Sequence, residues 1–155
     1  MKKVCFVCLG NICRSPMAEF VMKRLASQDQ IEISSRATSS WEQGNPIHQG
    51  TQSILNQYGI AYDKKKTAQQ IDLDDLRRFD YIIGMDHQNV SDLKKLSQGK
   101  WDDKIHLFNE DGVPDPWYTG DFEETYQLVM QGCRDWLSQL KNNNRIENVD
   151  EKDND

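Results

Sequence analysis

The sequence predicts an α/β fold of three layers, in which helices flank a twisted, parallel sheet of four strands. Two observations predict it. Short apolar runs alternate along the chain with longer segments whose apolar residues recur at helical spacing. The 155 residues suffice for one domain with a full core, and we find no internal repeat. We therefore expect a single domain over residues 1–141, with its ligand site beyond the carboxyl ends of the strands.

The first half of the chain supplies two strands and two helices. Residues 2–8 form a short apolar run that is typical of a buried strand, and residues 15–28 gather apolar side chains on one helical face. Residues 31–38 alternate apolar and polar side chains, as a strand does. Residues 46–60 have the pattern of a helix, and Gly59 is suited to end it.

The second half repeats this alternation. Residues 73–79 fit a short helix and residues 80–85 a second buried strand. Residues 86–97 fit a helix with basic residues in its last turn, where they complement the helix dipole. Residues 104–108 give the fourth strand. Residues 120–142 form a long amphipathic pattern that predicts the last helix.

Composition excludes several classes of protein. The formal net charge is −6, and the tail of residues 142–155 carries five acids and two bases, hence −3. This tail is polar and aperiodic, so we expect it to be disordered. The mildly acidic remainder argues against nucleic-acid binding. We find neither an apolar run of the roughly 18 residues that a membrane helix needs nor a signal peptide. We therefore expect a cytoplasmic protein, in which thiols stay reduced.

The stretch "CLGNICRS" joins the first strand to the first helix and has the composition of an anion-binding loop. Amides near a helix N-terminus attract anions, and Gly10 and Asn11 tolerate the positive φ angles of a tight loop. Arg14 adds a fork of donors suited to phosphate oxygens. In that positive field Cys8 would be a thiolate, and Ser15 could donate a hydrogen bond to its sulfur.

Other roles for the cysteines fit less well. Cys5, Cys8 and Cys13 have ligand-like spacings, but Cys5 and Cys8 lie three apart on a strand and point to opposite faces. A metal site or a thioredoxin-like CxxC is therefore disfavoured. Cys5 and Cys133 suit the core instead.

A nucleophile that attacks a phosphate ester benefits from a proton donor for the leaving group. Three histidines are candidates, but their places in a strand or at helix starts favour structural or solvated roles: His48, His87 and His106. Asp115 suits the role better, because Pro114 and Pro116 stiffen its segment after the fourth strand. Trp117 and Tyr118 beside it could form one wall of a pocket for an aromatic ring. An ordinary proline-rich turn is the alternative.

The chain resembles the low-molecular-weight protein tyrosine phosphatase family through "VCLGNICRSPMAE" and "DPWYTG". The resemblance covers about residues 1–141 and implies metal-independent hydrolysis of phosphotyrosine without a cofactor. It implies that Cys8 forms a phosphocysteine, that Arg14 clamps the phosphate and that Asp115 serves as acid and then base. The implied partners are phosphotyrosine-containing proteins. The sequence does not identify the oligomeric state, for which we favour a monomer.

The resemblance also implies roles around these three residues. The phosphate-binding loop would comprise Leu9, Gly10, Asn11, Ile12, Cys13 and Ser15. Cys13 would be the redox partner of Cys8. The substrate pocket would comprise Ile12, Trp41, Trp117 and Tyr118, and Asp86 would support the site. Where the family often has a histidine that braces the loop asparagine, Lys66 falls nearest, so the brace for Asn11 is left open.

Three related chemistries compete with this prediction. Arsenate reductases of this type need additional cysteines, and residues 58–100 contain none. Protein arginine phosphatases tend to have threonine where this chain has Ile12, and an apolar residue there favours an aryl group. A phosphate-binding module without activity would usually lack Cys8, Arg14 or Asp115, and this chain retains all three.

Overall fold

The computed structural model describes the backbone of residues 1–153 and the side chains of residues 1–142. Its centre is a parallel sheet of four strands in the order β2-β1-β3-β4. The strands are β1 (Lys2–Cys8), β2 (Ile31–Ala37), β3 (Tyr81–Gly84) and β4 (Ile105–Leu107). The predicted fold class is therefore confirmed.

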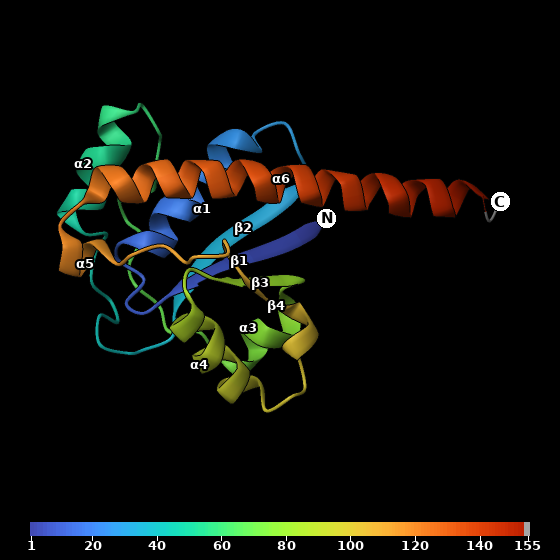
Figure 1. Ribbon diagram of the computed structural model, residues 1–155, viewed down its shortest axis with the longest axis horizontal. Coiled ribbons are helices and arrows are strands. Elements are labelled where there is room, and N and C mark those ends of the chain that lie inside the picture. The colour runs from blue at the N-terminus through green and yellow to red at the C-terminus, as the bar shows by residue number, and fades with distance from the viewer. Residues whose placement is uncertain (154–155) are drawn as a thin grey trace.

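Helices cover both faces of this sheet (Figure 1). On one face, α1 (Arg14–Leu25) packs against α2 (Gln49–Gln57) and the long helix α6 (Phe122–Asp153). On the other face lie α3 (Leu73–Arg78) and α4 (His87–Ser97). Two elements are shorter, the 3₁₀ turn η1 (Asp102–Lys104) and the helix α5 (Pro116–Thr119). The result is the predicted three-layer arrangement.

Strand β1 shows how the sequence fills both sides of the sheet. Val4, Phe6 and Cys8 point into the larger core with α1, α2 and α6, while Cys5 and Val7 point into the smaller core with α3 and α4. All five side chains are buried. Strand alternation thus separates Cys5 from Cys8, as predicted, and brings only Cys8 to the α1 side.

Some predicted element ends differ from the structure. The predicted helix at 46–60 starts only at Gln49, because Pro46 forms an antiparallel bridge with Thr67 and His48 caps the helix in extended conformation. Gly59 follows its end with a φ of 67°, as its pattern indicated. Helix α1 ends at Leu25 rather than 28.

The last helix also differs, since α6 continues to Asp153 although the apolar pattern ends near 142. A helix can propagate beyond its packed part because each further residue adds one backbone hydrogen bond. The side chains of the tail lie outside the described residues, so the expectation of a disordered acidic tail at 142–155 stays a prediction.

The strand order determines where a site can form. The chain leaves β1 toward β2 on one side, and β3 lies on the other side of β1, so β1 and β3 flank a topological switch point. Ligands of parallel sheets bind beyond the carboxyl ends of strands at such a point. The segments after β1, β3 and β4 meet there. Among the described residues, no helix is long and apolar enough to cross a membrane.

Candidate active site

The loop between β1 and α1 surrounds the sulfur of Cys8 with hydrogen-bond donors. The backbone N–H groups of Asn11 and Ser15 point at Sγ, with N···S distances of 3.3 and 3.4 Å. The Ser15 hydroxyl lies 3.0 Å from the same sulfur. Two backbone donors and one hydroxyl thus surround the sulfur at the start of a helix, where the amide dipoles favour negative charge.

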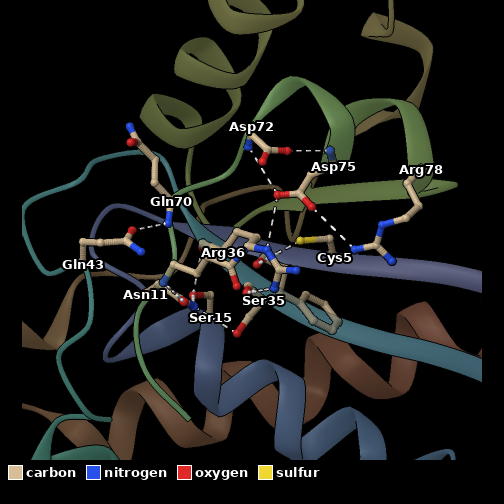
Figure 2. A network of polar contacts seen from close by, with 12 residues as sticks. Cys5, Asn11, Ser15, Ser35, Arg36, Gln43, Gln70, Asp72, Asp75 and Arg78 are labelled. Carbon is tan, nitrogen blue, oxygen red and sulfur yellow. Dashed lines mark hydrogen bonds and ion pairs between the residues drawn. The ribbon is translucent and has the colours of Figure 1, made fainter.

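The loop owes its shape to Asn11, which has a φ of 58°. Few residues other than glycine adopt this left-handed conformation, and asparagine is among those that tolerate it. The Asn11 Nδ2 group donates to Ser15 Oγ at 2.8 Å and to Ser35 Oγ at 2.9 Å, and Oδ1 accepts from the Gln69 amide at 3.0 Å. Figure 2 shows Asn11, Ser15 and Ser35 converging from the loop, α1 and β2. This buried amide therefore holds the loop in its strained form.

A buried ion pair lies behind this brace. The Ser35 hydroxyl donates to Glu19 Oε1 at 2.6 Å, and Lys66 Nζ lies 3.3 Å from the same oxygen. Lys23 Nζ lies 2.7 Å from the other carboxylate oxygen. With its proton committed to Glu19, Ser35 can only accept from Asn11. In the structure Asn11 is therefore held by Ser35, Ser15 and the Gln69 amide, and Lys66 contacts Asn11 only indirectly, through Glu19 and Ser35.

Arg14 is buried at the start of α1 and contacts two other segments, one at Asp86 and one at residues 113–115. Nη1 contacts Asp86 Oδ2 at 2.6 Å and the Val113 carbonyl oxygen at 2.9 Å, and Nη2 lies 3.3 Å from Asp115 Oδ2. Burial alone would lower the pKa of Arg14, but the charges of Cys8, Asp86 and Asp115 outweigh it and raise that pKa. Arg14 Nε is buried without a hydrogen-bond partner among the described residues, and it is a donor suited to an oxyanion.

Asp115 occupies the N-cap of α5 and is not part of a simple turn. Its Oδ1 accepts from the Trp117 backbone N–H at 3.0 Å, and Pro116 takes the first helical position, which its fixed φ suits. The short helix ends at Gly120, whose φ is 69°. This arrangement leaves Oδ2 facing Arg14, as described above, and Trp117 and Tyr118 exposed.

A pocket of about 190 Å³ lies over the loop. Apolar and aromatic side chains line it together with the charged side chains of Arg14, Glu42 and Asp115. Its lining comprises Cys8, Leu9, Gly10, Ile12, Cys13, Arg14, Trp41, Glu42, Asp115, Trp117 and Tyr118. The structure thus brings together every residue predicted for catalysis and for the substrate pocket, whereas Asn11 and Ser15 lie beneath it.

Sequence reasoning missed several residues of this region. Glu42 lines the pocket, where a Cβ on Gly10 would lie 3.3 Å from Glu42 Cγ. Glu19 and Ser35 also escaped notice, although an acid within the apolar run "PMAEFVM" and a serine at an inward position of β2 are the signals that could have found them. No single motif contains them, since they come from α1 and β2.

The cysteines are free thiols in the structure, and each is buried. Cys13 lines the pocket beside Cys8, and burial, together with the negative charge of Cys8, raises its pKa to about 12. Burial also raises the pKa of the core thiols Cys5 and Cys133. Within the described part of the chain, no group of His, Cys, Asp or Glu side chains could hold a metal ion.

The three histidines lie outside the pocket lining. His106 lies in β4, beside the Tyr81 and Trp136 rings, and burial lowers its pKa. His87 is exposed at the start of α4, and His48 caps α2.

Comparison with known proteins now adds to this geometry. The model of the family described as "Low molecular weight phosphotyrosine protein phosphatase" matches residues 3–146. The chain belongs to this family. It is 42% identical over 157 residues to the low molecular weight protein-tyrosine-phosphatase YfkJ of Bacillus subtilis, covering 94% of this chain and all of that protein.

Solved structures agree with this assignment. SP-PTP, a low molecular weight protein tyrosine phosphatase from Streptococcus pyogenes, superposes with a TM-score of 0.89 at 69% identity, covering 90% of this chain and 93% of that one. A Drosophila arginine phosphatase superposes with a TM-score of 0.82 at 29% identity, covering 91% and 98%. The chain is accordingly an enzyme of the low molecular weight protein-tyrosine phosphatase class, and its fold is that of these structures.

Proposed function

We propose that this phosphatase hydrolyses phosphotyrosine in proteins, and small aryl phosphates, through a phosphocysteine formed on Cys8. The observation that carries the proposal is that one pocket is lined by Cys8, Arg14 and Asp115, which come from segments about a hundred residues apart. These three groups are a nucleophile, a phosphate clamp and a proton donor, the parts that phosphoryl transfer to a thiolate requires.

In the first step the Cys8 thiolate attacks phosphorus, and the S–P bond forms as the bond from phosphorus to the phenolic oxygen breaks. Asp115, protonated for this step, gives its proton to the leaving oxygen, because a phenol of pKa about 10 leaves poorly as an anion. Arg14 and the loop amides of residues 9–15 bind the equatorial phosphate oxygens, where charge is spread in the transition state.

In the second step water attacks phosphorus, and the S–P bond breaks. Asp115, now a carboxylate, accepts a proton from that water, so the cycle returns the acid and releases inorganic phosphate. Ser15 and the amides of Asn11 and Ser15 stabilise Cys8 as the departing thiolate, since all three lie within 3.4 Å of its sulfur.

The pocket walls support an aryl substrate. Leu9 and Ile12 line it together with the rings of Trp41, Trp117 and Tyr118, and flat apolar surfaces of this kind suit a phenyl ring. An arginine phosphatase is the alternative to consider, given the relative from Drosophila. Ile12 disfavours that alternative, because its side chain offers no hydrogen bond to a guanidinium group.

The proposed substrate is tested by turnover of phosphotyrosine, phosphoarginine and phosphoserine peptides of matched sequence. We expect the phosphotyrosine peptide to have clearly the highest kcat/KM of the three. The Ile12→Thr variant should reduce the ratio of kcat/KM for phosphotyrosine to that for phosphoarginine. A preference of the native enzyme for phosphoarginine would overturn the substrate assignment.

The proposed roles are tested with variants of the catalytic groups. Cys8→Ser should abolish turnover. Asp115→Asn should lower kcat/KM, which reports on phosphoryl transfer to Cys8, about 10²- to 10⁴-fold for phenyl phosphate. The loss should be far smaller for 4-nitrophenyl phosphate, whose leaving group needs little protonation. Equal losses for both substrates would contradict the acid role.

We also propose that Cys13 protects Cys8 by forming a reversible disulfide under oxidation. The two thiols line the same pocket. Peroxide would convert the Cys8 thiolate to a sulfenic acid, and the Cys13 sulfur would then displace water to form the disulfide. Cys13→Ser should therefore retain turnover but lose its recovery by a thiol reductant after peroxide treatment. Full recovery of the variant would exclude this role.

A further inference from the structure

We propose that His48 is a positioning residue for catalysis, which fixes Trp117 and, through Trp117, the carboxyl group of Asp115. The proposal rests on the role of Asp115 proposed above. His48 lies outside the pocket lining, so it acts through another residue and does not touch the substrate. Four contacts carry the argument.

The first two contacts are with aromatic rings. The imidazole of His48 stacks on Phe122, with ring centroids 5.1 Å apart and planes 20° apart. It meets Trp117 edge to face, with centroids 5.6 Å apart and an interplanar angle of 81°. Offset stacking and edge-to-face contacts are the favoured arrangements of aromatic pairs. His48 thus lies between the start of α6 and the wall of the pocket.

The other two contacts immobilise His48 itself. Its backbone N–H donates to the Ile12 carbonyl oxygen in the phosphate-binding loop at 2.9 Å. Its ring Nδ1 accepts from the Gly50 backbone N–H at 2.9 Å and so caps α2. In the neutral ring this bond places the proton on Nε2. His48 is therefore anchored to the loop that carries the nucleophile.

Phe122 supports the imidazole from behind. Its ring occupies the space beside Gly50, where a Cβ would lie 2.4 Å from the Phe122 ring. Phe122 also packs against the small cluster that contains Ile12 and Cys13. Phe122 thus contacts the imidazole, Gly50 and the Ile12 cluster together, and this packing supports the imidazole where it meets Trp117.

Trp117 needs this support. Its side chain is 57% exposed, so burial does not fix it, and it belongs to α5, a helix of four residues. A helix this short has little stability of its own and depends on contacts with the rest of the fold. Because the Trp117 N–H donates to Asp115 Oδ1, a displacement of Trp117 also displaces the carboxyl group.

Two substitutions of His48 separate its ring from its capping nitrogen. His48→Asn keeps an acceptor suited to the N-cap and removes the ring. His48→Phe keeps an aromatic ring and removes the acceptor. We expect H48N to lower kcat/KM about tenfold for phenyl phosphate, a part of the full contribution of a general acid, and less than about twofold for 4-nitrophenyl phosphate. We expect H48F to keep most of the native kcat/KM for phenyl phosphate.

Several results would overturn the proposal: a native kcat/KM in H48N for both substrates, an equal loss of kcat/KM for both, or a loss in H48F as large as in H48N. The last result would mean that the cap of α2 is what matters. If H48N melts below the assay temperature, Trp117→Leu tests the same contact from the other side. The same dependence on the leaving group is expected there, and its absence refutes the proposal.

Asp115→Asn, assayed in parallel, separates this proposal from the proposed function. If D115N loses activity selectively with phenyl phosphate and H48N does not, the function stands and the role of His48 falls. If D115N shows no such selectivity, the acid role of Asp115 itself is wrong, and the role of His48 falls with it.

Discussion

Replacing Lys66 with methionine should destabilise the protein through the buried carboxylate that it neutralises. The Lys66 side chain is 12% exposed and Glu19 is 7% exposed, and Nζ lies 3.3 Å from Oε1. Methionine keeps much of the aliphatic length of lysine but brings no charge. The substitution therefore leaves the Glu19 carboxylate with Ser35 and Lys23 as its remaining partners.

The expected magnitude follows from these distances. With an effective dielectric constant of 20, two unit charges 3.3 Å apart attract each other by about 5 kcal/mol. Desolvation of both groups offsets most of this attraction. Lys23 remains, but its side chain is 46% exposed, so its contribution is screened by water. We expect a net loss of about 1–3 kcal/mol, the cost of a buried polar group that loses a partner.

Urea unfolding followed by circular dichroism measures this loss. The midpoint should fall while the slope m stays constant, since the native fold is unchanged. Lys64→Met, at an exposed position on the same segment, is the matched control and should stay within about 0.5 kcal/mol of the native protein. A second control is the double variant E19Q/K66M, in which residue 19 is a neutral amide that needs no counter-ion. Its free energy of unfolding should lie between those of K66M and the native protein.

The reasoning fails if K66M unfolds within about 0.5 kcal/mol of the native protein. It also fails if K64M loses as much as K66M, because the loss would then reflect the segment and not the ion pair. If E19Q/K66M is no more stable than K66M, the charge of Glu19 is not the origin of the cost.

Three further predictions concern packing, pH and thiol reactivity. Gly132→Ala should cost about 1–3 kcal/mol in urea unfolding, because a Cβ there would lie 2.2 Å from the buried Phe108 ring, and native stability would contradict this. Burial lowers the pKa of His106 in the folded protein below its ordinary value of 6.5, so the unfolded chain takes up a proton at a higher pH than the folded protein does. The free energy of unfolding therefore has its full value above pH 6.5 and falls as the pH drops below it. His106→Gln should therefore flatten the fall in unfolding free energy between pH 7 and pH 5, and an unchanged slope would exclude the effect. The pKa of about 12 keeps Cys13 protonated at pH 8, so iodoacetamide should leave Cys13 unmodified in the native protein, and peptide mapping that finds rapid modification would refute this.

Local patterns were enough to predict the fold and much of the pocket, whereas Trp41 came from the family resemblance and Glu42 was missed. Cys8 and Arg14 share one short loop, and loops after parallel strands meet at one edge of a sheet, so Asp115 could be placed near them before any coordinates. Trp117 and Tyr118 followed from their neighbour. In each case a contiguous stretch of sequence carried the information.

The support of the loop could not be predicted in the same way. Glu19, Ser35 and Lys66 lie in α1, in β2 and in a loop, and their contact depends on side-chain positions that no local pattern encodes. His48 presented the same difficulty, since its place at a helix start was expected but its contacts with Trp117 and Phe122 depend on where α5 and α6 lie in space. The predicted helix ends were wrong for a related reason, because tertiary contacts determine which residue caps a helix, as at His48.

The contacts of Arg14 have a consequence for how activity is lost on unfolding. One guanidinium group joins the first helix to the cap of α4 at Asp86, to the Val113 backbone and to Asp115, across as many as 101 positions of the chain. No fragment shorter than residues 14–115 contains all of these partners. Turnover should therefore disappear in the same cooperative transition as the sheet, and activity can serve as a direct reporter of the folded population.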